Sequence, residues 1–129
     1  MIPEGIKRTE SVKVVPENTA KMVGSGLAEV FATPAMLGLM EKTAALSVQE
    51  FLEEGQSTVG IKADISHVAA TPVGMTVTCE SELISVEGRK LTFRLKCYDD
   101  KEEVGSGTHE RFIVFADKFQ AKADAKAAQ

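Results

Sequence analysis

Three side chains able to do acid–base or nucleophilic chemistry stand out by where they lie. Glu41 is in the middle of VFATPAMLGLMEKTAALSVQEFL (30–52), and its neighbours three and four positions away are leucine, glycine and alanines. No Lys or Arg stands at helical pairing distance, so a carboxylate there either meets a partner from elsewhere or has a raised pKa. Both cases make Glu41 a candidate catalytic group. The alternative is an exposed face, with Lys42 and Gln49 marking a solvated edge.

Thr33 is the second candidate, because it lies where a helix is expected to begin. Thr33 followed by Pro34 predicts a helix with threonine as the N-cap and proline as the first helical residue. An N-cap hydroxyl lies at the positive end of the helix dipole, where negative charge is favoured. A threonine at this position is more often a cap and nothing else. The helix is apolar on almost every side, which predicts burial in a core, and Gly55 is the expected end.

His67 is the third candidate. In Thr58–Ala69 the sequence alternates with period two, and His67 shares the parity of the apolar residues, provided that no bulge intervenes. Gly60 falls on the other parity. A histidine on the helix-facing side of a sheet can move protons, although most such histidines are hydrogen-bonded core residues.

The remaining elements supply a sheet to hold these groups. We expect strands at Ser11–Val15, Met75–Val86, Leu91–Tyr98 and Glu103–Phe115, a loose lead-in over 1–8 and a frayed helix or tail over 117–129. A three-residue loop, Glu87–Arg89, would set Leu83 opposite Phe93 and Cys79 opposite Cys97. One apolar helix among consecutive strands predicts a single α+β domain over 1–129, with an antiparallel sheet wrapped around the helix.

Composition excludes several classes of function. The 129 residues are enough for one domain, and a net charge of −4 gives no reason to expect nucleic acid. The chain has no apolar run long enough for a membrane span and no signal-peptide core, so we expect a cytoplasmic protein without a membrane partner. The two cysteines do not form a disulfide framework, and no histidine or cysteine cluster has the spacing of a metal site.

Four segments in the same order resemble the fluoroacetyl-CoA thioesterase family. They are VFATPAMLGLME (30–41), SHVAATPVGMTVT (66–78), SVEGRKL (85–91) and GSGTHER (105–111). The resemblance runs from about residue 30 to 119. It implies the hot-dog fold, in which a curved antiparallel sheet wraps a central helix. It also implies a homodimer with its active site at the subunit interface, and leaves a tetramer open.

The resemblance also implies roles for particular residues. Thr33, Glu41 and His67 match the family's catalytic set, and Gly60 and Arg111 match its substrate contacts. Gly60 could instead mark a bulge only, and Arg111 could pair with a neighbouring glutamate or subunit. His109 is interpreted as structural. Members specific for fluoroacetyl-CoA resemble one another in having phenylalanines just before the helix, but residues 21–29 here read KMVGSGLAE, without an aromatic.

We therefore expect a thioesterase that hydrolyses a short or substituted acyl-CoA, with coenzyme A as part of the substrate and no separate cofactor. Glu41 and His67 would activate the Thr33 hydroxyl or a water, and His67 would pass the proton to the leaving thiolate. One alternative is a non-catalytic module that binds acyl-CoA or another small ligand. Another is a hydratase using Asp64 and His67, which opposite strand parity disfavours. Acyl-carrier protein is an alternative carrier of the thiol.

Overall fold

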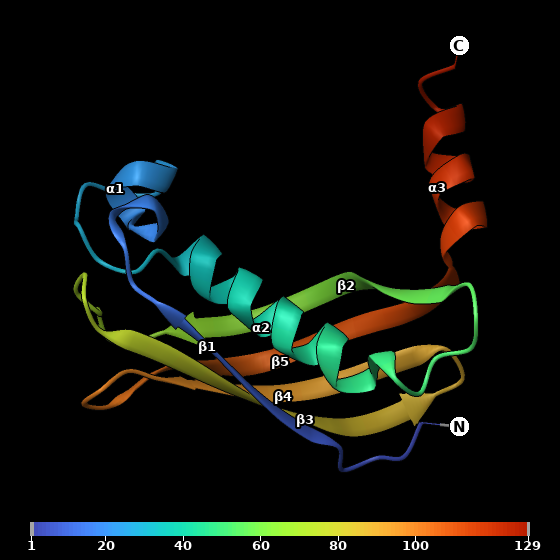
Figure 1. Ribbon diagram of the computed structural model, residues 1–129, viewed down its shortest axis with the longest axis horizontal. Helices are drawn as coiled ribbons and strands as arrows, with labels where there is room; N and C mark the ends of the chain where they lie inside the picture. The colour runs from blue at the N-terminus through green and yellow to red at the C-terminus, as the bar shows by residue number, and fades with distance from the viewer. Residues whose placement is uncertain (1, 129) are drawn as a thin grey trace.

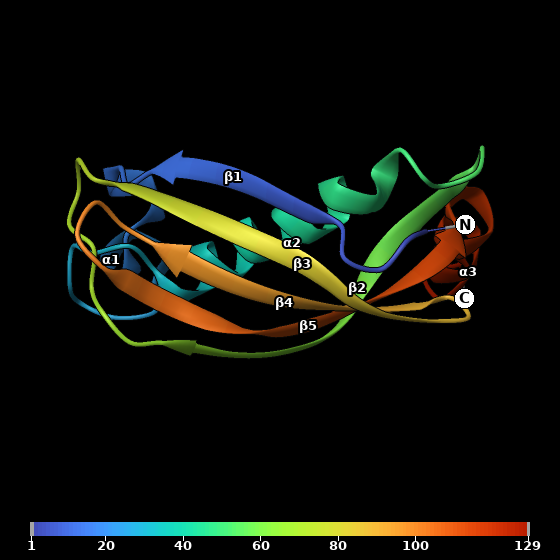
Figure 2. The ribbon, with the colours of Figure 1, turned by 90° about the horizontal axis from the view of Figure 1, so that it is seen from below.

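The computed structural model describes residues 2–128 and shows one long helix lying across one face of a five-stranded sheet (Figure 1). The elements in chain order are β1 (Lys7–Lys13), a 3₁₀ turn (Pro16–Asn18), α1 (Ala20–Val23), α2 (Thr33–Gln49), β2 (Gln56–His67), β3 (Thr76–Glu87), β4 (Lys90–Tyr98), β5 (Glu103–Phe115) and α3 (Ala116–Ala125). The strands are antiparallel in the order β1-β3-β4-β5-β2, so that β1 and β2 form the two edges (Figure 2). The predicted α+β fold with a sheet around a central helix is confirmed.

Helix α2 buries one face rather than all of them. Its buried residues are Met36, Leu39, Met40, Thr43, Ala44, Ser47 and Val48. The two hydroxyl groups among them donate to backbone carbonyls one turn back, Thr43 to Leu39 and Ser47 to Ala44, each at 2.6 Å, so neither of these two hydroxyls is left unpaired. Gly38 and Lys42 are exposed on the opposite side. The expectation of burial all round is wrong because a single sheet covers only one side of the helix.

Both predicted ends of this helix are also wrong. Ala32 is the N-cap and makes no side-chain capping bond, while Thr33 is already helical. The Thr33 hydroxyl bonds a side chain on another element, described below, instead of capping the helix. The helix ends at Gln49, and Gly55, with φ +84°, lies in the turn that leads to β2.

A bulge in β2 corrects the predicted faces of that strand. Gly60 pairs with Arg111 and Lys62 pairs with Glu110 on β5, so Ile61 between them is the extra residue. This residue switches the alternation of the strand. Gly60 and His67, predicted on opposite faces, therefore lie on the same face, toward α2. Ile61, predicted on the apolar face, is 51% exposed.

The β3–β4 hairpin has the predicted register with a different turn. Leu83 lies opposite Phe93 and Cys79 opposite Cys97, as expected. The connection is a two-residue turn, Gly88-Arg89, with φ +62° at the glycine, and not a three-residue loop. The loop is one residue shorter than predicted, and a register shift between Leu83 and Ser85 compensates for the difference. Both cysteines are buried free thiols.

The N-terminal end of the chain differs from the predicted loose lead-in. β1 begins at Lys7 rather than Ser11, and Ile2 is buried against the core, so the lead-in is part of the fold. At the other end α3 is a regular helix with no buried residue, and it projects away from the sheet (Figure 1). Among residues 2–128, no helix is both long enough and apolar enough to cross a membrane.

Candidate functional site

Thr33 and His67 form a close pair at the start of α2. The hydroxyl oxygen of Thr33 lies 2.7 Å from Nδ1 of His67, which is the last residue of β2. They line an open cavity of about 300 Å³, shared with the first residue of α1 and the residues that follow β2. The other nitrogen of the ring, Nε2, is buried, and no group within residues 2–128 forms a hydrogen bond with it. Nε2 of His67 is therefore free to form a hydrogen bond with a further group.

Burial changes the proton affinity of this histidine. Removal from water lowers the pKa of His67 below its ordinary value of 6.5, and the nearby backbone of Ala69 opposes part of that change. The ring is thus neutral at pH 7. A neutral ring can accept the Thr33 proton at Nδ1, in which case Nε2 carries the ring hydrogen.

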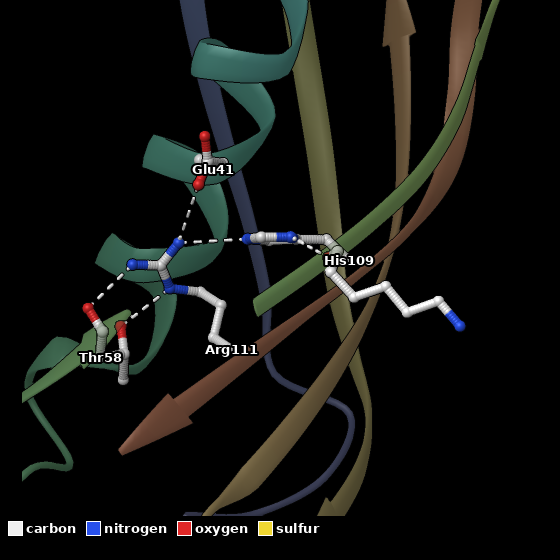
Figure 3. Close-up of polar contacts among 5 residues, drawn as sticks. Glu41, Thr58, His109 and Arg111 are labelled. Carbon is white, nitrogen blue, oxygen red and sulfur yellow. Dashed lines mark hydrogen bonds and ion pairs between the residues drawn. The ribbon is translucent and has the colours of Figure 1, made fainter. Parts of the chain in front are cut away.

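Glu41 lies in a second cluster, about two turns further along α2. Its carboxylate is 3.6 Å from a terminal nitrogen of Arg111 on β5, and the exposed fractions of the two side chains are 43% and 9% (Figure 3). The guanidinium also donates to the hydroxyl and the carbonyl of Thr58, each at 2.9 Å. Arg111 thus compensates the charge of Glu41, which had no partner on its own helix.

Gly60 is part of this second cluster because a side chain there would displace the Glu41 carboxylate. A Cβ at position 60 would lie 2.6 Å from Oε2 of Glu41 and 3.1 Å from Cε1 of His109. The backbone of Gly60 is not in the left-handed region, so the glycine is needed for space and not for its conformation.

The five predicted residues therefore form two groups within one chain. Thr33 and His67 make one, and Glu41, Arg111 and Gly60 make the other. Thr33 and Glu41 are eight residues apart on one helix, which is about 12 Å at 1.5 Å per residue. Glu41 of the same chain cannot reach His67 as a direct hydrogen-bond partner.

Two residues of the second cluster were missed by the sequence interpretation. Thr58 binds the guanidinium of Arg111. The sequence could have indicated Thr58 only if the bulge had been known, because the bulge sets Thr58 and Gly60 on the helix-facing side of β2. His109 was assigned a structural role, yet its Nε2 lies 3.1 Å from Arg111. The signal was its position two residues before Arg111 in the same strand, which puts both side chains on one face.

The segment before α2 covers the cavity at Thr33. Thr19 caps α1, a single helical turn, and the chain then crosses to α2 with Leu27 93% exposed. Met22 and Val23 are exposed as well. Residues 21–29 of this lid contain apolar side chains but no aromatic one, while Phe31, just before α2, is buried and lines the cavity. A separate hollow of about 320 Å³ lies over β1, β3 and β4 and contains none of the candidate residues.

Comparison with known proteins identifies the family of this chain. The model of the fluoroacetyl-CoA-specific thioesterase family matches residues 14–117. A fluoroacetyl-CoA thioesterase from Streptantibioticus cattleyicolor is 48% identical over 94 residues, 73% of this chain and 68% of that protein.

Two solved structures carry the same fold. The fluoroacetyl-CoA thioesterase FlK superposes with a TM-score of 0.93 at 39% identity, covering 98% of each chain. A hot-dog-like protein from Thermanaerovibrio acidaminovorans gives 0.88 at 26% identity, covering 97% of this chain and 93% of the other. The chain therefore belongs to the fluoroacetyl-CoA-specific thioesterase family, and it is a thioesterase with the hot-dog fold.

Proposed function

We propose that this chain hydrolyses the thioester bond of short acyl-CoAs, with Thr33 and His67 at the reacting carbonyl. The observation that carries the proposal is the 2.7 Å contact between the Thr33 hydroxyl and Nδ1 of His67 beside an open cavity. A hydroxyl held against a neutral imidazole is an activated nucleophile, or a means of orienting an attacking water.

The chemistry follows from the two ring nitrogens. Nδ1 takes a proton from Thr33 or from a water hydrogen-bonded to it, as the oxygen attacks the carbonyl carbon. The imidazolium then returns a proton to the leaving CoA sulfur when the carbon–sulfur bond breaks. Pro34 has no N–H, which leaves the first-turn N–H groups of Thr33 and Ala35 to hold the developing oxyanion. If an acyl-threonine forms, water releases it by the same route.

The missing acceptor for Nε2 comes, in this proposal, from a second copy of the chain. Strand β2 has a free edge, on which Lys62, Ala63 and Asp64 are exposed. Such edges are usually covered. A two-fold axis at Ala63 would place Lys62 opposite the partner's Asp64, and the same pair would repeat on the other side of the axis. Two favourable cross-strand charge pairs support this register.

The same register would bring the two groups of candidate residues together. If Ile61 and Lys62 share one position because of the bulge, counting from Ala63 places Ile65 opposite the partner's Gly60 and His67 opposite the partner's Thr58. All of these residues lie on the helix-facing side. Within one chain, the carboxylate of Glu41 occupies the space above Gly60. In the proposed register the partner's Glu41 would therefore lie beside His67. Its carboxylate is the acceptor that Nε2 lacks, and it would stabilise the imidazolium.

The acyl group is argued from the lining of the cavity. Besides Thr33 and His67, the lining residues carry no charge and most are small: Ala20, Ser25, Val30, Phe31, Val68, Ala69 and Ala70. Solved structures of FlK include a complex of a phenylalanine-to-alanine mutant with fluoroacetate and CoA, and a complex of a threonine-to-serine mutant with acetyl-CoA. We propose that this chain takes short, uncharged acyl-CoAs. It would discriminate little between acetyl and fluoroacetyl groups, because residues 21–29 of its lid lack an aromatic residue.

The test is thiol release from a panel of acetyl-, fluoroacetyl-, propionyl-, branched and carboxylated acyl-CoAs. Wild type should turn over the short uncharged members, while Thr33→Ala and Glu41→Gln should each lose on the order of 10²–10⁴ in rate. Binding of the CoA ester without turnover would show a binding module instead. Turnover of an acyl-carrier protein thioester alone would show a different carrier. A cytoplasmic location stays a prediction.

Mixing the two inactive variants tests the shared site. In a mixed dimer of Thr33→Ala with Glu41→Gln, one site receives both changes and the other receives none. Random assembly should therefore restore about a quarter of the wild-type activity. Mixing either variant with the double variant restores none and serves as the control. If the first mixture stays inactive although mass spectrometry shows mixed dimers, Glu41 and Thr33 act within one chain and the proposed arrangement is wrong.

A further inference from the structure

His109 is a buried titratable side chain that the proposed mechanism does not use. Its exposed fraction is 2%, and its ring stacks on Phe93 of β4 with a centroid distance of 6.4 Å. One ring nitrogen, Nδ1, lies 2.8 Å from the backbone carbonyl of Lys62, directly after the bulge in β2. The other, Nε2, lies 3.1 Å from the terminal nitrogen of Arg111 that faces Glu41 (Figure 3).

These two contacts fix the tautomer of the ring. Arginine can only donate, so Nε2 of His109 must accept from Arg111. The carbonyl of Lys62 can only accept, so Nδ1 must carry the hydrogen. Both bonds together require a neutral ring with hydrogen on Nδ1. A second proton, on Nε2, would point at the N–H of a guanidinium and break the bond to Arg111.

The surroundings of His109 favour this neutral state on balance, chiefly through burial. Burial is the largest cause and lowers its pKa below 6.5, and the positive charge of Arg111 lowers it further. The Lys62 carbonyl, Glu41 on α2 and the adjacent Glu110 act in the opposite direction.

We propose that His109 is the positioning residue that directs Arg111, and through it Glu41, into the active site. The side of the guanidinium that binds Thr58 is held by two hydrogen bonds. The nitrogen facing Glu41 forms an ion pair with that carboxylate, and His109 is its only hydrogen-bond partner within residues 2–128. His109 also ties that nitrogen to the bulge, which places Gly60 beside the same carboxylate. The proposal rests on the proposed function, because it assigns Glu41 a part in turnover.

Two substitutions separate the two bonds of the ring. In His109→Gln the amide can reach the place of Nε2, and its oxygen can accept from Arg111. In His109→Asn the amide nitrogen takes the place of Nδ1 and can donate to Lys62, but nothing accepts from Arg111. Both variants lose the ring that stacks on Phe93, so they should unfold at similar temperatures. We expect kcat within about threefold of wild type for Gln and reduced about tenfold to a hundredfold for Asn, with KM little changed in both.

The pH profile supplies a readout that a merely structural role would not move. His67 and His109 must both be neutral for activity. In the wild type, a plot of log kcat/KM against pH should therefore approach a slope of two on the acid side. His109→Gln leaves one such group and should approach a slope of one. Equal kcat for the two variants, or a slope of two in His109→Gln, would overturn the proposal.

A measurement on the wild type stands even if neither variant folds. Nitrogen-15 NMR of labelled histidine should show His109 as the Nδ1–H tautomer at pH 7.5, with Nε2 unprotonated. Observation of the Nε2–H tautomer would refute the positioning role. A wild type that releases no thiol, yet shows the Nδ1–H tautomer, would refute the proposed function while leaving the contact with Arg111 intact.

Discussion

Replacement of Gly60 by alanine should lower the rate without unfolding the protein. The new methyl carbon would lie 2.6 Å from Oε2 of Glu41, 3.1 Å from His109 and 3.4 Å from Arg111. An ordinary contact needs about 3.4 Å or more, so the carboxylate has to move by about 0.8 Å. Glu41 is flexible and partly exposed, and it can move. The two buried neighbours need shifts of a few tenths of an ångström at most.

The effects on stability and on rate are expected to differ in size. Alanine restricts the unfolded chain more than glycine does, which stabilises a compatible site by about 0.4–1 kcal/mol and offsets the small strain. We therefore expect the free energy of unfolding to change by less than about 1 kcal/mol. A displacement near 1 Å of a group that orients the reaction can cost about 10²-fold.

Three measurements decide the matter. Urea unfolding gives the stability of Gly60→Ala, thiol release gives kcat and KM, and the same substitution in a Glu41→Gln background gives the coupling. If the methyl group acts through Glu41, it should cost much less in that background. The reasoning would be refuted if Gly60→Ala had the same kcat/KM as the wild type. It would also be refuted if the substitution lowered kcat/KM by the same factor in the wild-type and the Glu41→Gln backgrounds.

Three further predictions follow from individual contacts. Thr58→Val keeps the backbone bond to Arg111 but removes the hydroxyl, and urea unfolding should show a loss of about 1 kcal/mol. Both histidines have a lowered pKa in the folded chain, so the unfolded chain binds more protons below pH 6.5. Thermal melts should accordingly show a falling Tm from pH 7.5 to 5.5, and a rising Tm would contradict the cited shifts. Cys79 and Cys97 are buried, so a thiol reagent should label them only on unfolding, and rapid labelling of the native protein would show that the core opens.

The pattern of the sequence predicted the fold class, because that pattern survives small local errors, and the resemblance of four segments to the family implied the thioesterase activity. The apolar helix stands out whatever its ends are, and four alternating segments can only form an antiparallel sheet around it. The register of β3 and β4 was right although the turn was not, since the apolar faces of both strands must meet the helix. Pairing is decided by burial along the whole strand, and a bulge after Leu83 absorbs the shorter turn.

The arrangement of the candidate site could not be predicted in the same way. Thr33 was singled out as a catalytic candidate, but its hydroxyl was also expected to cap the helix, because the local sequence does not reveal that His67 competes for it. The relation of Gly60 to His67 depends on one unpaired residue, and only the glycine hinted at it. Glu41 was rightly singled out as lacking a partner on its helix. Its partner Arg111 lies seventy residues away on another strand, and no local pattern identifies it.

The bulge at Ile61 also bears on how this strand could change length during evolution. His67 lies seven positions after Gly60, yet both face the helix because one of the intervening residues has no partner on β5. Loss of a single residue from this stretch would leave a regular strand in which the two residues are six positions apart. That even spacing also keeps both side chains on one face. The strand can therefore absorb a one-residue deletion by straightening. Any further loss of one residue would turn either the glycine or the histidine away from the helix.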